Sequence, residues 1–192
     1  VANDLWDQDF DRKVTRTKQR PLALRTIHSS VAVGLLLVML LLSFLIVVSL
    51  PTNNIALCLI VALLALPAIL FYPSAKRWFP YPQAILAICW GFAVRMPWAA
   101  SESSLSGGLP LRSCWLATLT WTFGFDTVYA MADYKDDRTL ALHSSVISLG
   151  PYSKNVVAIS YALATTFLAA GAYWAGVKLI FWPFWIISSL GM

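Results

Sequence analysis

The feature that most constrains this chain is a stretch of 50 consecutive residues, 26–75, that contains no Asp, Glu, Lys or Arg. A second uncharged stretch covers residues 155–177. A helix of roughly 20 apolar residues crosses the hydrocarbon core of a bilayer, so both stretches predict membrane-spanning helices. The 192 residues are 59% hydrophobic and only 12% charged, which excludes a disordered chain and an ordinary soluble domain.

Turn residues divide the apolar stretches into separate spans. We expect full spans at residues 31–50, 55–72, 84–100, 111–131 and 155–173, and part of a sixth at 179–190. Residues 1–11 are typical of the polar end of an earlier helix. The spans are continuously apolar and do not alternate, which favours helices over barrel strands. The predicted fold class is therefore an all-α, polytopic transmembrane helix bundle, with residues 1–192 in a single membrane-embedded domain.

The basic residues predict the orientation of this bundle. Eleven of the 14 Lys and Arg fall in loops on one side: Arg12, Lys13, Arg16, Lys18, Arg20, Arg25, Lys76, Arg77, Lys135, Arg138 and Lys154. Because positive loops stay on the cytoplasmic side, we expect a multi-pass protein of a bacterial inner membrane, or an equivalent membrane, with these loops in the cytoplasm. The net charge of +5 is then a topology signal, and we expect no nucleic-acid partner.

The acidic residues are concentrated in two groups. Eight of the nine are Asp4, Asp7, Asp9, Asp11, Asp126, Asp133, Asp136 and Asp137. Four predicted spans separate the groups, so both groups lie on the same side of the membrane. Helical spacing places Asn3, Asp4, Asp7 and Asp11 on one face, and Asp126, Tyr129, Asp133 and Asp137 on another.

Two facing sets of carboxylates repel each other unless protons or a cation neutralise them. Asp and Asn oxygens without His or Cys partners suit Mg²⁺, which shares its coordination shell with phosphate oxygens. The neighbouring Lys and Arg side chains are suitable partners for such a phosphate. The residues therefore predict a magnesium–phosphate site at the cytoplasmic ends of the helices, where Asp126 is the most deeply placed carboxylate.

Four ordered motifs resemble the UbiA-type membrane prenyltransferases. They are Asn3-Asp4-Leu5-Trp6-Asp7-Gln8-Asp9-Phe10-Asp11, Arg16-Thr17-Lys18-Gln19-Arg20-Pro21-Leu22, Tyr72-Pro73-Ser74-Ala75-Lys76-Arg77 and Asp126-Thr127-Val128-Tyr129-Ala130-Met131-Ala132-Asp133-Tyr134-Lys135-Asp136-Asp137. Within the family, the chain is most similar to 4-hydroxybenzoate polyprenyltransferases. The resemblance implies Mg²⁺-dependent transfer of a polyprenyl group from a prenyl diphosphate to an aromatic acid, in the biosynthesis of ubiquinone-type or plastoquinone-type quinones.

The resemblance also implies roles for individual residues. The catalytic candidates are Asp7, Asp11, Asp126 and Asp133, and the metal ligands are these four with Asn3 and Asp137. The candidates for binding substrate are Asn3, Arg16, Arg20, Tyr72, Lys76, Arg77, Tyr129, Lys135 and Arg138. Among these, Arg77 is expected to bind the carboxylate of the aromatic acid.

Two departures from the family pattern and several alternatives bear on this expectation. Gln8 and Asp9 stand where close relatives carry basic residues, and His143-Ser144-Ser145 replaces a Lys-Ser-Thr element. The nine-helix family fold implies that its first helix, most of its second and its last one or two lie outside residues 1–192. The alternatives are another aromatic acceptor, such as homogentisate or a naphthoate, an intramembrane cation or proton transporter, and a structural membrane subunit.

Overall fold

The computed structural model describes residues 1–191, and every regular element in that range is helical. The elements in chain order are α1 (Ala2–Asp11), α2 (Ser29–Val48), α3 (Ile55–Phe71), η1 (Tyr72–Arg77), α4 (Pro82–Glu102), α5 (Gly108–Thr139), α6 (Ser145–Leu149), η2 (Gly150–Tyr152), α7 (Ser153–Trp174) and α8 (Phe181–Leu190). The all-α prediction is confirmed, and the helices begin and end within about three residues of the predicted spans, except that α5 continues eight residues further.

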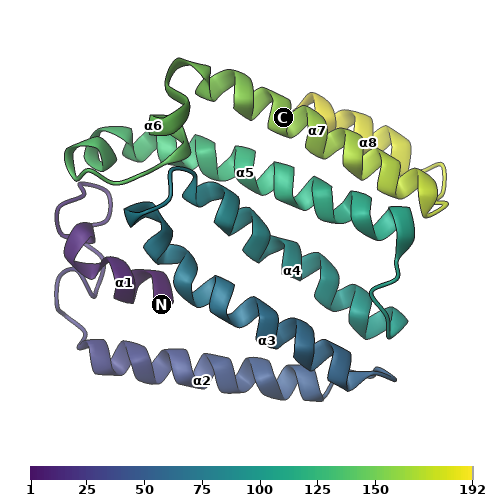
Figure 1. The fold of residues 1–192 in the computed structure, drawn as a ribbon, viewed down its shortest axis with the longest axis horizontal. Coiled ribbons are helices and arrows are strands. Elements are labelled where there is room, and N and C mark those ends of the chain that lie inside the picture. The colour runs from purple at the N-terminus through teal and green to yellow at the C-terminus, as the bar shows by residue number, and fades with distance from the viewer. Residues whose placement is uncertain (192) are drawn as a thin grey trace.

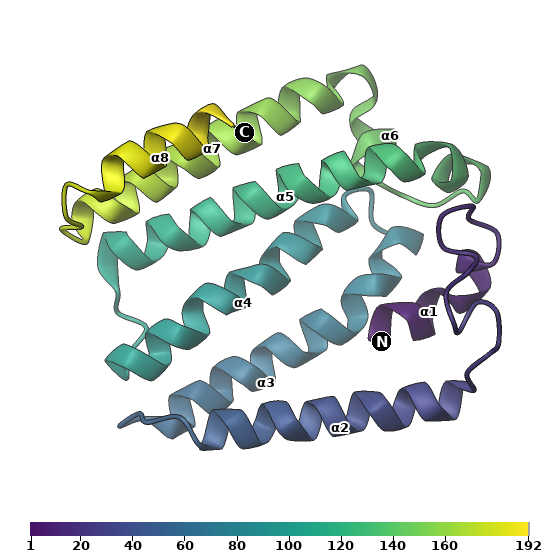
Figure 2. The ribbon, with the colours of Figure 1, turned by 180° about the vertical axis from the view of Figure 1, so that it is seen from behind.

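The long helices are arranged as an antiparallel row. Figure 1 shows α2, α3, α4, α5 and α7 side by side in chain order, and Figure 2 shows the same row from behind. Short α1 lies at the end of the row where α3 ends and α4 begins, and the turn after α5 lies at that same end (Figure 1). The two aspartate groups therefore meet at one end of the bundle, as the count of spans predicted.

Four helical segments are long and apolar enough to cross a membrane: Ser29–Val48, Ile55–Arg77, Pro82–Glu102 and Ser145–Trp174. The fourth predicted span, 111–131, lies within α5. With 32 residues, α5 is about 48 Å long, but it is less apolar than the other four because Asp126 and several Thr, Trp and Tyr residues interrupt its hydrophobic surface. Its last eight residues, 132–139, continue beyond the predicted span and carry three aspartates.

Local chemistry explains where several helices begin. The Asn54 side chain accepts a hydrogen bond from the backbone N–H of Leu57 at 3.1 Å, which caps α3. Pro82 occupies the first position of α4, where a missing N–H costs nothing. The hydroxyl of Ser144 caps α6, a five-residue helix that the sequence did not predict because it is too short to show periodicity.

The contact between α5 and α7 depends on small residues. Gly124 of α5 faces Ser160 and Tyr161 of α7, and Gly171 of α7 faces Cys114 and Ser113 of α5. Small side chains allow membrane helices to approach closely. A Cβ atom at position 124 would lie 3.0 Å from the Cβ of Ser160, so this contact has no room for a larger residue.

We expect Gly124→Leu to destabilise the protein by about 1–3 kcal/mol, because the added side chain forces α5 and α7 apart. Gly34→Leu is the matched control, since no atom lies within 4 Å of a Cβ at Gly34. Thermal unfolding in detergent measures both variants. A Gly124→Leu variant as stable as the Gly34→Leu variant would contradict this packing.

Candidate active site

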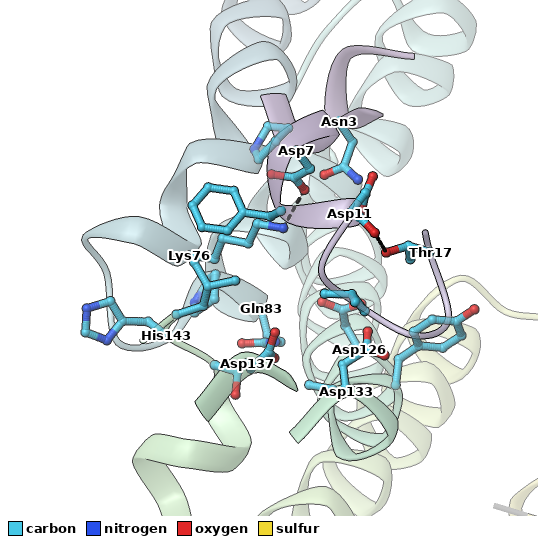
Figure 3. Close-up of a pocket in the computed structure, with 18 of the residues that line it drawn as sticks. Asn3, Asp7, Asp11, Thr17, Lys76, Gln83, Asp126, Asp133, Asp137 and His143 are labelled. Carbon is cyan, nitrogen blue, oxygen red and sulfur yellow. Dashed lines mark hydrogen bonds and ion pairs between the residues drawn. The ribbon is translucent and has the colours of Figure 1, made fainter. Parts of the chain in front are cut away.

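A cavity of about 240 Å³ lies where α1, η1 and the charged end of α5 meet. Its lining combines two rows of polar residues with a few apolar ones: Asn3, Asp7, Phe10, Asp11, Val14, Arg16, Thr17, Arg20, Tyr72, Pro73, Lys76, Pro82, Gln83, Asp126, Tyr129, Ala130, Asp133, Asp137, Leu142, His143 and Ser144. Figure 3 shows Asn3, Asp7 and Asp11 on one side of the cavity, and Asp126, Asp133 and Asp137 on the other. The two predicted rows of aspartates therefore face each other across one space.

Asp7 is the most deeply buried carboxylate of the first row, with 1% of its surface exposed. Its Oδ2 atom accepts a hydrogen bond from Lys76 Nζ at 2.5 Å, and its Oδ1 atom accepts one from Arg77 Nη2 at 3.2 Å. Burial raises the pKa of Asp7 above its ordinary value, while the charges of Lys76 and Arg77 act in the opposite direction. These two cations join α1 to η1 and offset much of the cost of burying the carboxylate.

Asp11 is held by the loop that follows α1. Arg20 Nη1 lies 3.0 Å from Asp11 Oδ2 and 3.0 Å from Asp4 Oδ1, so one guanidinium bridges both carboxylates. The hydroxyl of Thr17 also donates to the backbone oxygen of Asp11 at 3.3 Å. The loop of residues 12–28 is therefore folded back against the helix that precedes it.

Arg16 of the same loop binds Asp133 of α5, in the second row of aspartates. Its Nε and Nη2 atoms donate to the two carboxylate oxygens of Asp133, at 2.9 and 2.5 Å. The hydrogen bonds to Asp133 are the largest cause of a raised pKa of Arg16. The guanidinium also lies over the ring of Tyr129, 5.1 Å from its centroid, which fixes its plane.

Asp126 and Asp137 differ from the other lining carboxylates because neither forms an ion pair with any residue of the described range 1–191. Burial, followed by the charge of Asp133, raises the pKa of Asp137 to about 6. Asp137 lies beyond the apolar part of α5, in the charged last turns of that helix. These two carboxylates have their oxygens available for a cation.

The donor chemistry fits Mg²⁺ combined with a phosphate ligand. Within residues 1–191, no three His, Cys, Asp or Glu side chains lie close enough to hold one metal ion by themselves. Mg²⁺ does not need such a cage, since it is usually bound by one or two carboxylates together with phosphate oxygens and water. Carboxylates on both walls and the amide oxygen of Asn3 supply hard oxygen donors to the space between them.

Comparison with known proteins establishes the family. Residues 1–192 match the UbiA prenyltransferase family over their whole length.

The chain belongs to the UbiA prenyltransferase family.

Similar relatives are named after one reaction. The chain is 43% identical over 188 residues to a 4-hydroxybenzoate solanesyltransferase of Synechocystis sp., covering 98% of this chain and 61% of the relative. It is 37% identical over 187 residues to a 4-hydroxybenzoate octaprenyltransferase of Cupriavidus necator, covering 97% of this chain and 62% of the relative. This UbiA-family chain thus spans about three-fifths of the length of these two relatives.

A solved structure shares both the fold and part of the sequence. The apo structure of a UbiA homolog from Aeropyrum pernix K1 superposes with a TM-score of 0.85 at 28% identity, covering 98% of this chain and 70% of that chain. The family match and this structural match favour the prenyltransferase interpretation over the transporter and the structural subunit.

The structure brings most of the predicted site residues to the cavity wall and leaves three of them outside. The residues on the wall are Asn3, Asp7, Asp11, Arg16, Arg20, Tyr72, Lys76, Asp126, Tyr129, Asp133 and Asp137. The residues outside the lining are Arg77, Lys135 and Arg138. Lys135 and Arg138 are exposed on α5.

Arg77 faces α1 rather than the cavity. Its Nη2 atom donates to the backbone oxygen of Trp6 at 2.6 Å and to Asp7, and its guanidinium lies 4.9 Å from the ring centroid of Phe10. Arg77 is therefore occupied in fastening α1, and the predicted contact with the acceptor carboxylate has no support in this arrangement.

Gln83 and Ser144 line the cavity but were not predicted as site residues. Both are almost fully buried, with 6% and 1% of their surfaces exposed. The sequence contained a signal for Gln83, because a polar residue in the first turn of an apolar helix requires a partner. Ser144 belongs to the His143-Ser144-Ser145 element that departs from the family pattern, but its capping role could not be predicted, because the helix that it caps has only five residues.

We expect Asp133→Asn to loosen the loop of residues 12–28. Loss of the bidentate Arg16–Asp133 ion pair lowers the free energy of opening the loop by about 1 kcal/mol. The open fraction of the loop therefore increases about fivefold. Limited trypsin digestion in detergent, followed by mass spectrometry of cuts at Lys13 and Lys18, measures that fraction.

Asp9→Asn is the matched control, because Asp9 pairs with Arg12 of the same loop but its side chain is 81% exposed. Equal cleavage of the two variants would show that the Arg16–Asp133 pair does not hold the loop.

Proposed function

We propose that the protein transfers a polyprenyl group from a prenyl diphosphate to the ring of an aromatic acid, 4-hydroxybenzoate, in quinone biosynthesis. The observation that carries the proposal is the pair of aspartate rows facing each other across one buried cavity. The names of the relatives support 4-hydroxybenzoate over homogentisate or a naphthoate as acceptor. The clustering of basic loops on this side supports a cavity that opens towards the cytoplasm.

The diphosphate is held between the two walls in this proposal. Asn3, Asp7, Asp11, Asp126, Asp133 and Asp137 would hold Mg²⁺. Bound Mg²⁺ stabilises the negative charge that develops on the departing diphosphate. Lys76, Arg16 and Arg20 lie against these carboxylates at the cavity wall, where they would donate hydrogen bonds to the diphosphate oxygens. Lys135 and Arg138 stand at the outer end of α5, where they attract the anionic substrate.

Loss of diphosphate leaves an allylic cation, which must be kept from water. The apolar helices shield the cation, and the face of Tyr129 is available to stabilise it. The C–O bond of the prenyl diphosphate breaks with its electron pair on the diphosphate. The ring carbon next to the phenol hydroxyl forms the new C–C bond, and the ring then releases a proton. The lipid bilayer accommodates the polyprenyl tail and the product.

We expect Asp7→Asn and Asp133→Asn each to lower the rate of prenyl transfer by at least about a hundredfold, because each removes charge from one wall of the site. The measurement is formation of prenylated 4-hydroxybenzoate by membranes that contain the polypeptide carrying residues 1–192. EDTA should abolish product formation, and added Mg²⁺ should restore it. Asp9→Asn is the control with unchanged activity, because Asp9 points away from the cavity into solvent.

Full activity of the Asp7→Asn and Asp133→Asn variants would refute the proposed site. Activity with homogentisate or a naphthoate but not with 4-hydroxybenzoate would refute the acceptor.

A further inference from the structure

The amide of Gln83 presents an unpaired donor to the cavity. Its Oε1 atom accepts the backbone N–H of Ser145 at 2.9 Å, so the orientation of the amide group is fixed. Its Nε2 atom donates to no acceptor among residues 1–191, although the residue is only 6% exposed. Gln83 lines the cavity, and Figure 3 shows it between Lys76 and Asp137. Among residues 1–191, no fully buried side-chain nitrogen or oxygen lacks a partner, so the unpaired Nε2 atom is accessible from the cavity. An accessible amide nitrogen without a protein partner is a donor available to a ligand.

Ser144, the residue before the one that Gln83 binds, supplies a second donor to the same cavity. Its Oγ atom accepts the N–H of Ile147 at 3.4 Å as the cap of α6, which leaves the hydroxyl hydrogen free to point elsewhere. No acceptor for this hydroxyl lies within the described part of the chain. Ser144 is 1% exposed and lines the same cavity.

The segment that carries both donors is rigidly supported. Ser145, which binds Gln83 through its backbone, also shares a hydrogen bond of 2.8 Å with the hydroxyl of Thr127 on α5, and both side chains are completely buried. The backbone N–H of His143 donates to the backbone oxygen of Lys76 at 2.7 Å. The loop after α5 is thereby fixed to η1, α4 and α5 at once. A binding group needs such support to keep its geometry.

The charged donors of the cavity are paired with aspartates, and the proposed function assigns them to the diphosphate. Each Lys or Arg that lines it is paired with an aspartate: Lys76 with Asp7, Arg16 with Asp133, and Arg20 with Asp11. An amide and a hydroxyl match the two oxygens of a carboxylate, which carries a single charge. A diphosphate carries more charge and is better matched by the metal and the cations.

We propose that Gln83 Nε2 and Ser144 Oγ bind the carboxylate of the aromatic acceptor and thereby select acids over neutral phenols. This inference rests on the proposed function, and it gives Gln83 and Ser144 the role for which Arg77 was the candidate from sequence. A site built to donate hydrogen bonds to a substrate group discriminates strongly against substrates that lack the group.

Gln83→Glu tests the inference by exchanging the donor for an acceptor. The new carboxylate keeps an oxygen for the N–H of Ser145 and places a second, anionic oxygen where the amide nitrogen was. It repels the carboxylate of 4-hydroxybenzoate, but it accepts a hydrogen bond from the amide of 4-hydroxybenzamide. We expect the ratio of kcat/KM for 4-hydroxybenzoate to that for 4-hydroxybenzamide to fall by about a hundredfold at pH 8, roughly tenfold from each substrate.

The assay uses membranes that contain the polypeptide carrying residues 1–192, with both acceptors and one prenyl diphosphate. The KM for the prenyl diphosphate should change less than about twofold, and equilibrium binding of labelled 4-hydroxybenzoate should weaken in parallel with kcat/KM. Ser144→Ala should weaken binding of 4-hydroxybenzoate without improving that of 4-hydroxybenzamide. If the Gln83→Glu variant does not fold, the Ser144→Ala variant tests the inference: unchanged binding of 4-hydroxybenzoate by this variant would overturn it. Gln19→Glu is the matched control, because it adds the same charge on the exposed loop. It should change neither the acid-to-amide ratio nor the binding of 4-hydroxybenzoate.

An unchanged acid-to-amide ratio in a folded Gln83→Glu variant, or an increased KM for the prenyl diphosphate instead, would overturn the inference and leave the proposed function standing. Wild-type membranes that prenylate neither acceptor would overturn both.

Discussion

Charge neutralisation at one end of an apolar bundle is the interaction on which the rest of this structure depends. The two aspartate rows cannot approach each other without partners, because buried carboxylates repel each other and lose their hydration. The chain supplies those partners from the loop of residues 12–28 and from η1, through the pairs Lys76–Asp7, Arg20–Asp11 and Arg16–Asp133. These pairs hold α1, the loop and α5 around the cavity.

The same pairs explain how a cavity lined by so many carboxylates can be stable without the substrate that we propose for it. Each of these cations neutralises an aspartate in the free protein. In the proposed function, the same Lys and Arg side chains would serve as partners for the diphosphate, so little charge would be left uncompensated in either state. The Lys76–Asp7 pair is the most buried on its acidic side, whereas Arg16 of the Arg16–Asp133 pair is 42% exposed, so the surroundings strengthen the first pair more than the second.

Much of this arrangement follows from the sequence. The length of the uncharged stretches predicts the helices, and the even number of spans between Asp7 and Asp133 predicts that both residues lie at the same end. Helical spacing places Asp126, Asp133 and Asp137 on one face of α5, where they line the cavity.

Other features depend on contacts that no local pattern encodes. The position of Arg77 is set by Trp6, Phe10 and Asp7 on another helix, so a basic residue in the expected motif faces away from the cavity. The role of Ser144 depends on a single turn of helix and on the loop that follows α5. The backbone N–H of Ser145 binds the side-chain oxygen of Gln83 and so fixes the orientation of its amide nitrogen. This contact joins residues that lie 62 positions apart in the sequence.

The most direct test of the account is a double-mutant cycle on metal binding at Asp7 and Asp133. Mn²⁺, bound in place of Mg²⁺ together with a non-reacting prenyl thiodiphosphate, is followed by electron paramagnetic resonance in the wild type, Asp7→Asn, Asp133→Asn and the double variant. If both walls share one metal–diphosphate cluster, either single change removes most of the affinity and the second change adds little. Additive losses, or Mn²⁺ affinity independent of the thiodiphosphate, would contradict a cluster bridging the two rows.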